Sequence, residues 1–112
     1  MPKKKIVILA TSSPFATLNN HEVLRMTLGL IDLKVSVIWR GDGVYNSVKG
    51  VDNRSTQPFI KLFLNLDVGL YVDRGDLEER GLDGAELISE VTALESSDVL
   101  DLVNEADVVL TF

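Results

Sequence analysis

Hydrophobic residues are spaced along the chain in two ways, one typical of strands and one typical of helices. Runs that are continuous, or that alternate every second residue, indicate strands of a sheet buried on both faces. They predict strands at Lys4–Ala10, Lys34–Trp39, Val68–Val72, Glu90–Leu94 and Asp107–Phe112. Between them, helical spacing of apolar residues predicts helices at Asn20–Ile31 and Phe59–Leu66, a short helix within Asp76–Gly84, and a helix capped by Ser96 or Ser97.

Five strands that alternate with helical segments favour one fold class. Parallel neighbours in a sheet need a crossover connection of a dozen or more residues, and helices usually supply it. The chain is therefore expected to be α/β, a single three-layer α/β/α domain over residues 1–112 with a five-stranded parallel sheet. Its 112 residues suffice to bury a core without disulfides or a structural metal.

Glycine and polar residues mark the expected turns. Gly41 and Gly43 permit a tight turn after the second strand, and Gly81 is expected to end the short helix in a left-handed conformation. The stretch Asn46–Ser55 is the most loop-like part of the chain, with room for a short helical turn at Tyr45–Val48.

The predicted helix Phe59–Leu66 is apolar on nearly all sides, because only Lys61 and Asn65 are polar within it. A helix of this kind needs burial on more than one side. Two interpretations stay open: the helix contacts another subunit, or it is an ordinary core helix pressed between the sheet and a loop. The residues that would make the subunit contact are Phe59, Ile60, Leu62 and Phe63.

Charge is distributed unevenly along the chain, whose formal net charge is −6. From Asp67 to Asp107, thirteen Asp or Glu residues stand against only Arg74 and Arg80. Such an acidic half repels phosphate backbones, so direct binding of nucleic acid is not expected. The acidic half is either a solvated face or, as the less common alternative, a surface for a basic partner.

The chain contains no cysteine, which excludes a disulfide framework, thiolate metal ligands and thiol catalysis by this chain. The apolar run near its start, Ile6–Ala10, is too short for a signal-peptide core or a membrane span. A cytoplasmic protein without membrane contact is therefore expected.

Asp73 is the first candidate for chemistry, because reacting groups in open α/β sheets gather beyond the carboxyl ends of strands. A phosphoacceptor aspartate would also need acidic metal ligands after the first strand, where Thr11 and Ser12 stand.

His21 is the only histidine in the sequence. A cluster of histidines is therefore excluded, and any Ser-His-Asp set would have to use His21. Asp42, between two glycines, is more typical of a turn than of catalysis. The residues alone predict no catalytic set, no metal site and no cofactor.

The loop Thr11–Thr17 after the first strand carries four hydroxyl side chains and suggests an alternative function. Such loops donate hydrogen bonds to phosphate in flavodoxin-like folds, which would make the chain a small-ligand or nucleotide-binding module. The loop has no glycine and contains Pro14, however, so a connection capped by small polar residues is the simpler interpretation.

Taken in order, several motifs resemble the DsrE/DsrF family, and most closely its DsrF and TusC branch. They are the hydroxyl-rich loop, HEVL at 21–24, GDGV at 41–44, FIKLFLNL at 59–66, LYVDRGDLEERGL at 70–82 and DVVLTF at 107–112. The resemblance spans nearly the whole chain and implies a DsrEFH-like variant of the flavodoxin-like fold. It also implies a small subunit of a cytoplasmic sulfur-relay complex, a heterohexamer with two copies each of three related proteins.

The resemblance further implies how sulfur moves in such a complex. A DsrE or TusD subunit accepts persulfide sulfur on a cysteine where the third strand meets its helix, and passes it to a DsrC or TusE partner. The relay serves tRNA 2-thiouridine formation or sulfur oxidation. The matching position here is Asp73, and a carboxylate cannot hold a persulfide, because the relay needs a thiolate.

The implied role is therefore a subunit without catalysis, whose partners are DsrE/TusD-like and DsrH/TusB-like subunits. Besides the apolar helix, the residues expected to shape this chain for its partners are Asp42, Gly43, Val44, Arg80, Gly81 and Leu82.

Overall fold

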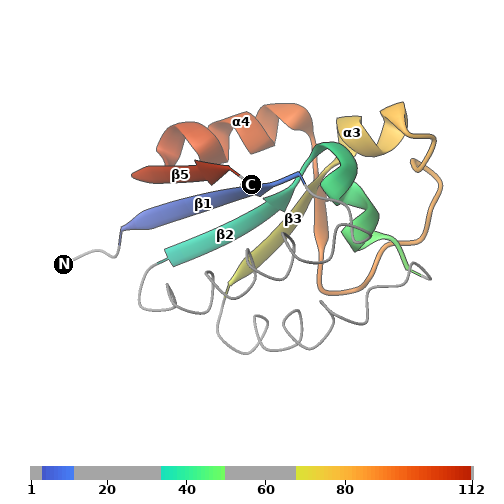
Figure 1. The fold of residues 1–112 in the computed structure, drawn as a ribbon, viewed down its shortest axis with the longest axis horizontal. Coiled ribbons are helices and arrows are strands. Elements are labelled where there is room, and N and C mark those ends of the chain that lie inside the picture. Colours follow the sequence, from blue (N-terminus) through green and yellow to red (C-terminus); the bar gives the residue numbers. More distant parts are fainter. Residues whose placement is uncertain (1–3, 12–33, 50–67, 112) are drawn as a thin grey trace.

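A computed structural model describes residues 4–11, 34–49 and 68–111 of the chain. Its five strands lie in one sheet (Figure 1). The strands are β1 Lys5–Ala10, β2 Lys34–Trp39, β3 Gly69–Asp73, β4 Thr92–Leu94 and β5 Val108–Thr111. The described helices are the 3-10 helix η1 Gly41–Ser47 and the α-helices α3 Arg74–Glu79 and α4 Ser96–Glu105.

All neighbouring strands are parallel, in the order β4-β3-β2-β1-β5. The chain adds strands on one side of β1 as far as β4, and then returns across the sheet to place β5 on the other side of β1. This reversal puts a topological switch point between β1 and β5. The predicted α/β class and the five-stranded parallel sheet are confirmed.

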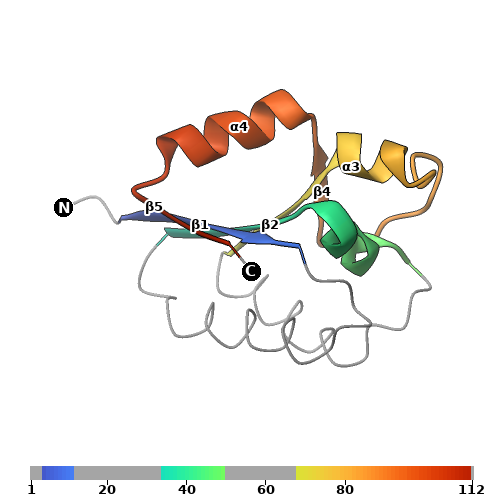
Figure 2. The ribbon, with the colours of Figure 1, turned by 45° about the horizontal axis from the view of Figure 1, so that its top comes forward.

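Each face of the sheet has its own hydrophobic core. One face contributes the buried side chains Ile6, Ile8, Ala10, Val35, Val37, Trp39, Leu70 and Val72, which pack with Val44 of η1 and Leu77 of α3. On the other face lies α4 (Figure 2), whose Val99 packs with Val7 and Ile38 of the sheet. The apolar residues of this segment that recur with helical spacing therefore face the sheet; they are Val99, Leu102, Val103 and Ala106.

The segment after β2 is more regular than its composition suggests. The helix η1 includes Asn46 and Ser47, which lie in the loop-like stretch where a short helical turn was also considered, and both are buried. Asn46 Nδ2 donates to the carbonyl of Gly43 at 2.9 Å, and Ser47 Oγ donates to the carbonyl of Val44 at 2.6 Å. Polar side chains that bond the local backbone tolerate burial, so these residues do not mark a loop here.

Two smaller predictions are wrong. Neither Ser96 nor Ser97 caps α4, because its N-cap residue is Glu95, which makes no side-chain cap hydrogen bond. The fourth strand is also shorter than predicted, since β4 begins only at Thr92. Both differences lie at the ends of elements, where local sequence signals are least specific.

Some predictions lie outside the described residues. They are the helices Asn20–Ile31 and Phe59–Leu66, with the contact residues Phe59, Ile60, Leu62 and Phe63, and the loop beyond Thr11. Within the described ranges, none of the helices has the length and apolar character needed to cross a membrane.

Candidate functional site

Asp73 is the last residue of β3 and caps α3, the helix that follows. Its Oδ1 accepts a hydrogen bond from the backbone N–H of Asp76 at 3.1 Å. The same oxygen accepts a hydrogen bond from the hydroxyl of Ser96, the first residue of α4, at 2.9 Å. Asp73 is 0% exposed. One buried oxygen atom therefore joins β3, α3 and α4.

The second carboxylate oxygen of Asp73 faces an arginine from the neighbouring strand. Arg40 follows β2 directly, and its Nε lies 3.5 Å from Oδ2 of Asp73 and 3.8 Å from Oδ2 of Asp76. Neither Arg40 Nε nor Asp73 Oδ2 has a hydrogen-bond partner among the described residues, so this contact is a charge attraction. Because 42% of the Arg40 side chain is exposed, solvent screens part of that attraction.

Asp76 and Gly75 complete the arrangement, which we call the Asp73 cluster: Asp73, Arg40, Gly75, Asp76 and Ser96. Oδ2 of Asp76 accepts a hydrogen bond from the backbone N–H of Gly41 at 2.8 Å, which ties the start of η1 to α3. A Cβ at Gly75 would lie 2.7 Å from Ser96 Oγ and 3.2 Å from Asp73 Oδ1. A glycine is therefore needed at position 75 for Ser96 to approach Asp73.

Asp42 and Arg80, both expected from the motifs, pair with each other beside the Asp73 cluster. Arg80 donates from Nε and from Nη2 to Oδ1 of Asp42 at 3.2 Å each. Its Nη1 donates to the carbonyl of Asp76 at 3.2 Å. The pair links η1 to the end of α3. The Asp42 side chain is 68% exposed, so its carboxylate faces solvent.

Gly43 and Val44 face the interior of this chain. A Cβ at Gly43 would lie 2.2 Å from the carbonyl oxygen of Ala10, so η1 packs directly on the end of β1. Val44 is fully buried in the core. An effect of these two residues on a partner would act through the position of η1 rather than through direct contact.

Gly81 and Leu82 end α3. Gly81 has a φ of +69°, in the left-handed region. Its N–H donates to the carbonyl of Glu78 at 3.0 Å, and the N–H of Leu82 donates to the carbonyl of Leu77 at 2.8 Å. These two hydrogen bonds form the Schellman motif. Leu82 then packs against the core that contains Leu77. The predicted helix stop at Gly81 is confirmed.

Sequence reasoning singled out Asp73 but missed the rest of its cluster. The spacing from Asp73 to Asp76 is that of an N-cap and the third helical residue, and it was a readable signal of a capped helix. Arg40 carried a weaker signal, as the residue that follows the neighbouring strand. Ser96 carried none, because it lies 23 residues from Asp73 and meets it only through the path of α4.

The chemistry of this site is that of a buried and paired carboxylate. The described residues include no group of three or more His, Cys, Asp or Glu that could hold a metal ion. Oδ1 of Asp73 is occupied by two donors and shielded from solvent, so a substrate would reach it only if those bonds broke. The arrangement holds four elements together at the carboxyl end of the sheet.

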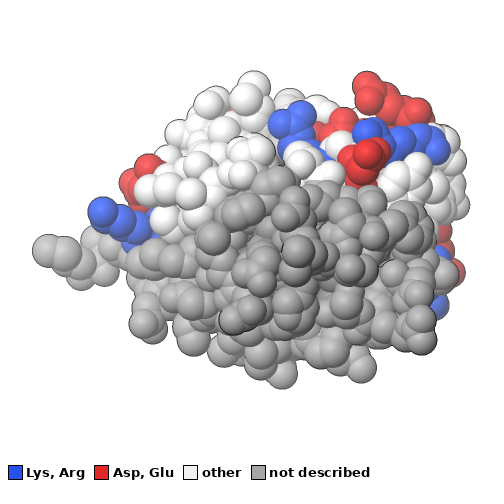
Figure 3. Space-filling view, in the orientation of Figure 1, with Lys and Arg blue, Asp and Glu red and all other residues white. Residues whose placement is uncertain are grey.

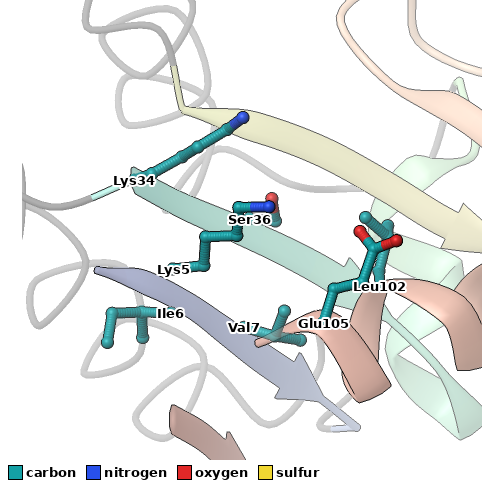
Figure 4. A pocket seen from close by; sticks show the side chains of 7 residues that line it. All are labelled: Lys5, Ile6, Val7, Lys34, Ser36, Leu102 and Glu105. Atoms are coloured by element: carbon teal, nitrogen blue, oxygen red, sulfur yellow. The ribbon is translucent and has the colours of Figure 1, made fainter. Parts of the chain in front are cut away.

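A small cavity lies at the opposite end of the sheet, between α4 and the first residues of β1 and β2 (Figure 4). Its volume is ≈ 70 Å³, and its lining residues are Lys5, Ile6, Val7, Lys34, Ser36, Leu102 and Glu105. Ligands of open α/β sheets bind beyond the carboxyl ends of strands, and this cavity is at the amino ends. It is therefore separate from the Asp73 cluster.

Comparison with known sequences decides the family. The profile of the DsrE/DsrF-like family matches residues 4–112. The chain belongs to the DsrE/DsrF-like family. The resemblance inferred from the motifs is thus confirmed for this DsrE/DsrF-like protein, and the match covers all of the described elements.

Two curated relatives carry names from the DsrF and TusC branch. The protein is 29% identical over 131 residues to the intracellular sulfur oxidation protein DsrF of Allochromatium vinosum, covering 97% of this chain and 96% of the relative. It is 30% identical over 84 residues to a TusC homolog of Vibrio vulnificus, covering 70% of this chain and 71% of the relative. The branch suggested by the motifs is confirmed.

Solved structures of similar shape support the fold. The ychN protein of E. coli superposes with a TM-score of 0.83 at 22% identity, covering 97% of this chain and 99% of that protein. The protein MTH1491 of Methanobacterium thermoautotrophicum gives a TM-score of 0.72 at 13% identity, with coverage of 98% and 99%. The DsrE/DsrF-like chain therefore shares its architecture with both proteins.

Proposed function

We propose that this protein is a DsrF/TusC-like subunit of a cytoplasmic sulfur-relay complex and carries no reacting sulfur itself. The observation that supports this is Asp73, a fully buried carboxylate at the strand end where the resemblance implies a sulfur-accepting cysteine. Sulfur relay needs a thiolate that attacks and then stores sulfur as a persulfide. A carboxylate does neither, and the sequence contains no cysteine elsewhere.

In this proposal the Asp73 cluster has a structural role. The two donors on Oδ1 and the charge of Arg40 hold β3, α3, α4 and the end of β2 in one fixed arrangement. The subunit thereby presents a rigid surface to its partners. We infer those partners to be a DsrE/TusD-like and a DsrH/TusB-like subunit, in a heterohexamer with two copies of each chain. The DsrE/TusD-like cysteine then passes sulfur to a DsrC/TusE-like acceptor, for tRNA 2-thiolation or sulfur oxidation.

Co-expression tests the proposal. The chain is produced with the DsrE-like and DsrH-like proteins of its own genome, and the product is analysed by size-exclusion chromatography with light scattering. A stable complex of the three chains is expected. After exposure to inorganic polysulfide, mass spectrometry should find an added sulfur atom on the DsrE-like chain and none on this one. Failure of the three chains to co-purify would overturn the proposal.

The apolar helix expected at Phe59–Leu66 gives a sharper version of the same experiment. Phe63→Asp introduces a charge into the expected contact stripe, and we expect it to prevent assembly while the chain alone stays folded by circular dichroism. Lys61→Asp, at a polar position of the same segment, is the matched control and should assemble normally. Unchanged assembly of the Phe63→Asp protein would remove this helix from the interface.

A second candidate function has one observation in its favour. The topological switch point between β1 and β5 is where open α/β sheets bind ligands, and the loop that starts at Thr11 leaves the sheet there. A flavodoxin-like small-ligand or nucleotide-binding module would use this place. Thermal-shift measurements with flavins and nucleotides test it, because a ligand that binds the native state raises the melting temperature. No shift at saturating ligand would exclude this function.

A further inference from the structure

Two Asp-Gly dipeptides occur in the sequence, Asp42–Gly43 and Asp83–Gly84. An aspartate before glycine can react with its own backbone, because glycine has no Cβ to restrict the approach of its amide nitrogen to the carboxyl carbon. The reaction needs a carboxyl group and an amide that are free of other partners, and a backbone that can bend into a five-membered ring. The structure treats the two dipeptides differently in each of these respects.

Asp83 and Gly84 are the central residues of a turn in the connection from α3 to β4 (Figure 1). The N–H of Ala85 closes this turn by donating to the carbonyl of Leu82 at 3.0 Å. In the described part of the chain, neither the Asp83 carboxylate nor the Gly84 N–H takes part in a hydrogen bond or an ion pair. Both residues are exposed. The two groups that would react are therefore available to each other.

The surroundings of Gly84 leave room for ring formation. A Cβ at Gly84 would meet nothing within 4 Å. On another side, Asp83 borders a cavity of ≈ 480 Å³ between α3, this turn and β4. Charged side chains, which need solvent, gather on the surface around α3 (Figure 3). The turn therefore has space to bend, and water reaches this end of the molecule.

The other dipeptide, Asp42–Gly43, is held in place by the fold. The N–H of Gly43 donates to the carbonyl of Arg40 at 2.9 Å, and Oδ1 of Asp42 accepts two hydrogen bonds from Arg80 at 3.2 Å each. Gly43 is buried, and a Cβ there would overlap the carbonyl oxygen of Ala10. Helix η1 would have to open before a ring could form at this dipeptide.

We propose that Asp83 is a site of spontaneous isomerisation to isoaspartate, and that the fold protects Asp42 from the same reaction. The nitrogen of Gly84 attacks Cγ of the protonated Asp83 carboxyl group. A C–N bond forms, a C–O bond breaks, and the hydroxyl leaves as water together with the amide proton. Water then adds to the main-chain carbonyl of this succinimide and breaks its bond to nitrogen. The chain now continues through Cβ and Cγ, with no change in mass and no oxidation or reduction.

The product changes the surface beside the end of α3. Isomerisation lengthens the backbone by one methylene group and moves the carboxylate onto Cα. The change lies directly after Leu82, whose N–H completes the Schellman motif. It therefore alters the neighbourhood of Arg80, Gly81 and Leu82, which are expected to shape the chain for its partners. The inference does not depend on the sulfur-relay proposal, because the reaction needs only this chain and water.

Ageing of the purified chain tests the proposal. The native protein is kept in neutral buffer for several weeks and digested with an endoproteinase that cleaves before aspartate but not before isoaspartate. Chromatography and mass spectrometry then identify the peptides. We expect isoaspartate to form at position 83 at least about tenfold faster than at position 42, because η1 must open before position 42 reacts. In the chain unfolded by urea, the two rates should agree within about threefold, since local opening no longer limits either site.

Gly84→Ala provides a second arm of the test. An alanine restricts the backbone torsions that ring closure needs, so the rate at position 83 should fall by at least about tenfold, while circular dichroism stays unchanged. The rate at position 42, measured in the same molecules, is the matched control and should not change. Equal rates at the two positions in the native protein would overturn the inference. So would an absence of isoaspartate at position 83 after a time at which the urea-unfolded chain contains it.

Discussion

The hydroxyl of Ser96 donates a hydrogen bond to Oδ1 of Asp73 at 2.9 Å, and so joins the first turn of α4 to the end of β3. The same oxygen caps α3. A residue that looks like a reacting group in the sequence is therefore a junction between three elements. A structural role and a chemical role of Asp73 lead to different outcomes when its neighbours are substituted.

Ser96→Ala removes one of the two donors to Asp73 Oδ1. A hydrogen bond of this kind contributes about 1 kcal/mol to stability, and we expect urea denaturation to show a loss of that size with an unchanged m value. Ser97→Ala is the matched control, because Ser97 is exposed on the same turn, and its effect should stay below about 0.5 kcal/mol. Equal effects of the two substitutions would contradict the assigned contact.

Substitutions of Asp73 itself separate hydrogen bonding from charge. Asp73→Ala removes the cap of α3, the acceptor for Ser96 and the charge beside Arg40, and should lower the free energy of unfolding by about 3 kcal/mol. Asp73→Asn keeps an oxygen that accepts both hydrogen bonds and loses only the charge, so we expect about 1 kcal/mol. Denaturant titration of both variants measures this difference, and similar losses would show that the charge dominates.

Asp73→Cys tests whether position 73 becomes chemically competent when it carries a thiol. We expect the thiol to react with an aromatic disulfide reagent at least about a hundredfold more slowly in the native than in the unfolded protein, because the position is buried. Ser97→Cys, on the exposed side of α4, should react at the rate of a free thiol. Rapid labelling and persulfide formation at position 73 would instead favour a latent sulfur site.

Gly43 and Gly81 are each required for a different structural reason, and Gly84 serves as the control. Gly43→Ala places a Cβ against the carbonyl of Ala10 and should cost about 3 kcal/mol. Gly81→Ala forces a side chain into the left-handed region and should cost about 1 kcal/mol. At Gly84 a Cβ would meet nothing within 4 Å, so Gly84→Ala should change stability by less than about 0.5 kcal/mol. Thermal and urea denaturation check all three.

The pair formed by Asp42 and Arg80 should contribute little to stability. Asp42 is largely exposed, and exposed ion pairs are worth about 0.5 kcal/mol. A double-mutant cycle with Asp42→Ala and Arg80→Ala measures the coupling. If both single variants are stable and yet fail to join a sulfur-relay complex, the pair acts at a subunit surface, as the motifs lead us to expect.

The candidate site could be predicted from the sequence only in part. Local signals were enough for Asp73 at a strand end and for Gly81 as a helix stop, because each depends on neighbours within one element. The contacts of Asp73 with Ser96 and Arg40 depend on where α4 crosses the sheet and on which strand lies next to β3. Residue spacing does not indicate the contact with Ser96, and the only signal for Arg40 is its position directly after a predicted strand.

The sequence by itself determined which segments are strands and that α4 carries an apolar stripe, because the period of side chains along a strand or helix is a local property. It also determined that this chain has no thiol at position 73 or elsewhere. The tertiary structure decided the strand order, with β5 beyond β1 and at an edge. All the strand segments are strongly apolar, so their pattern is compatible with many orders, and only the packing of both faces selects one. That same packing encloses Asp73 and leaves β5 exposed.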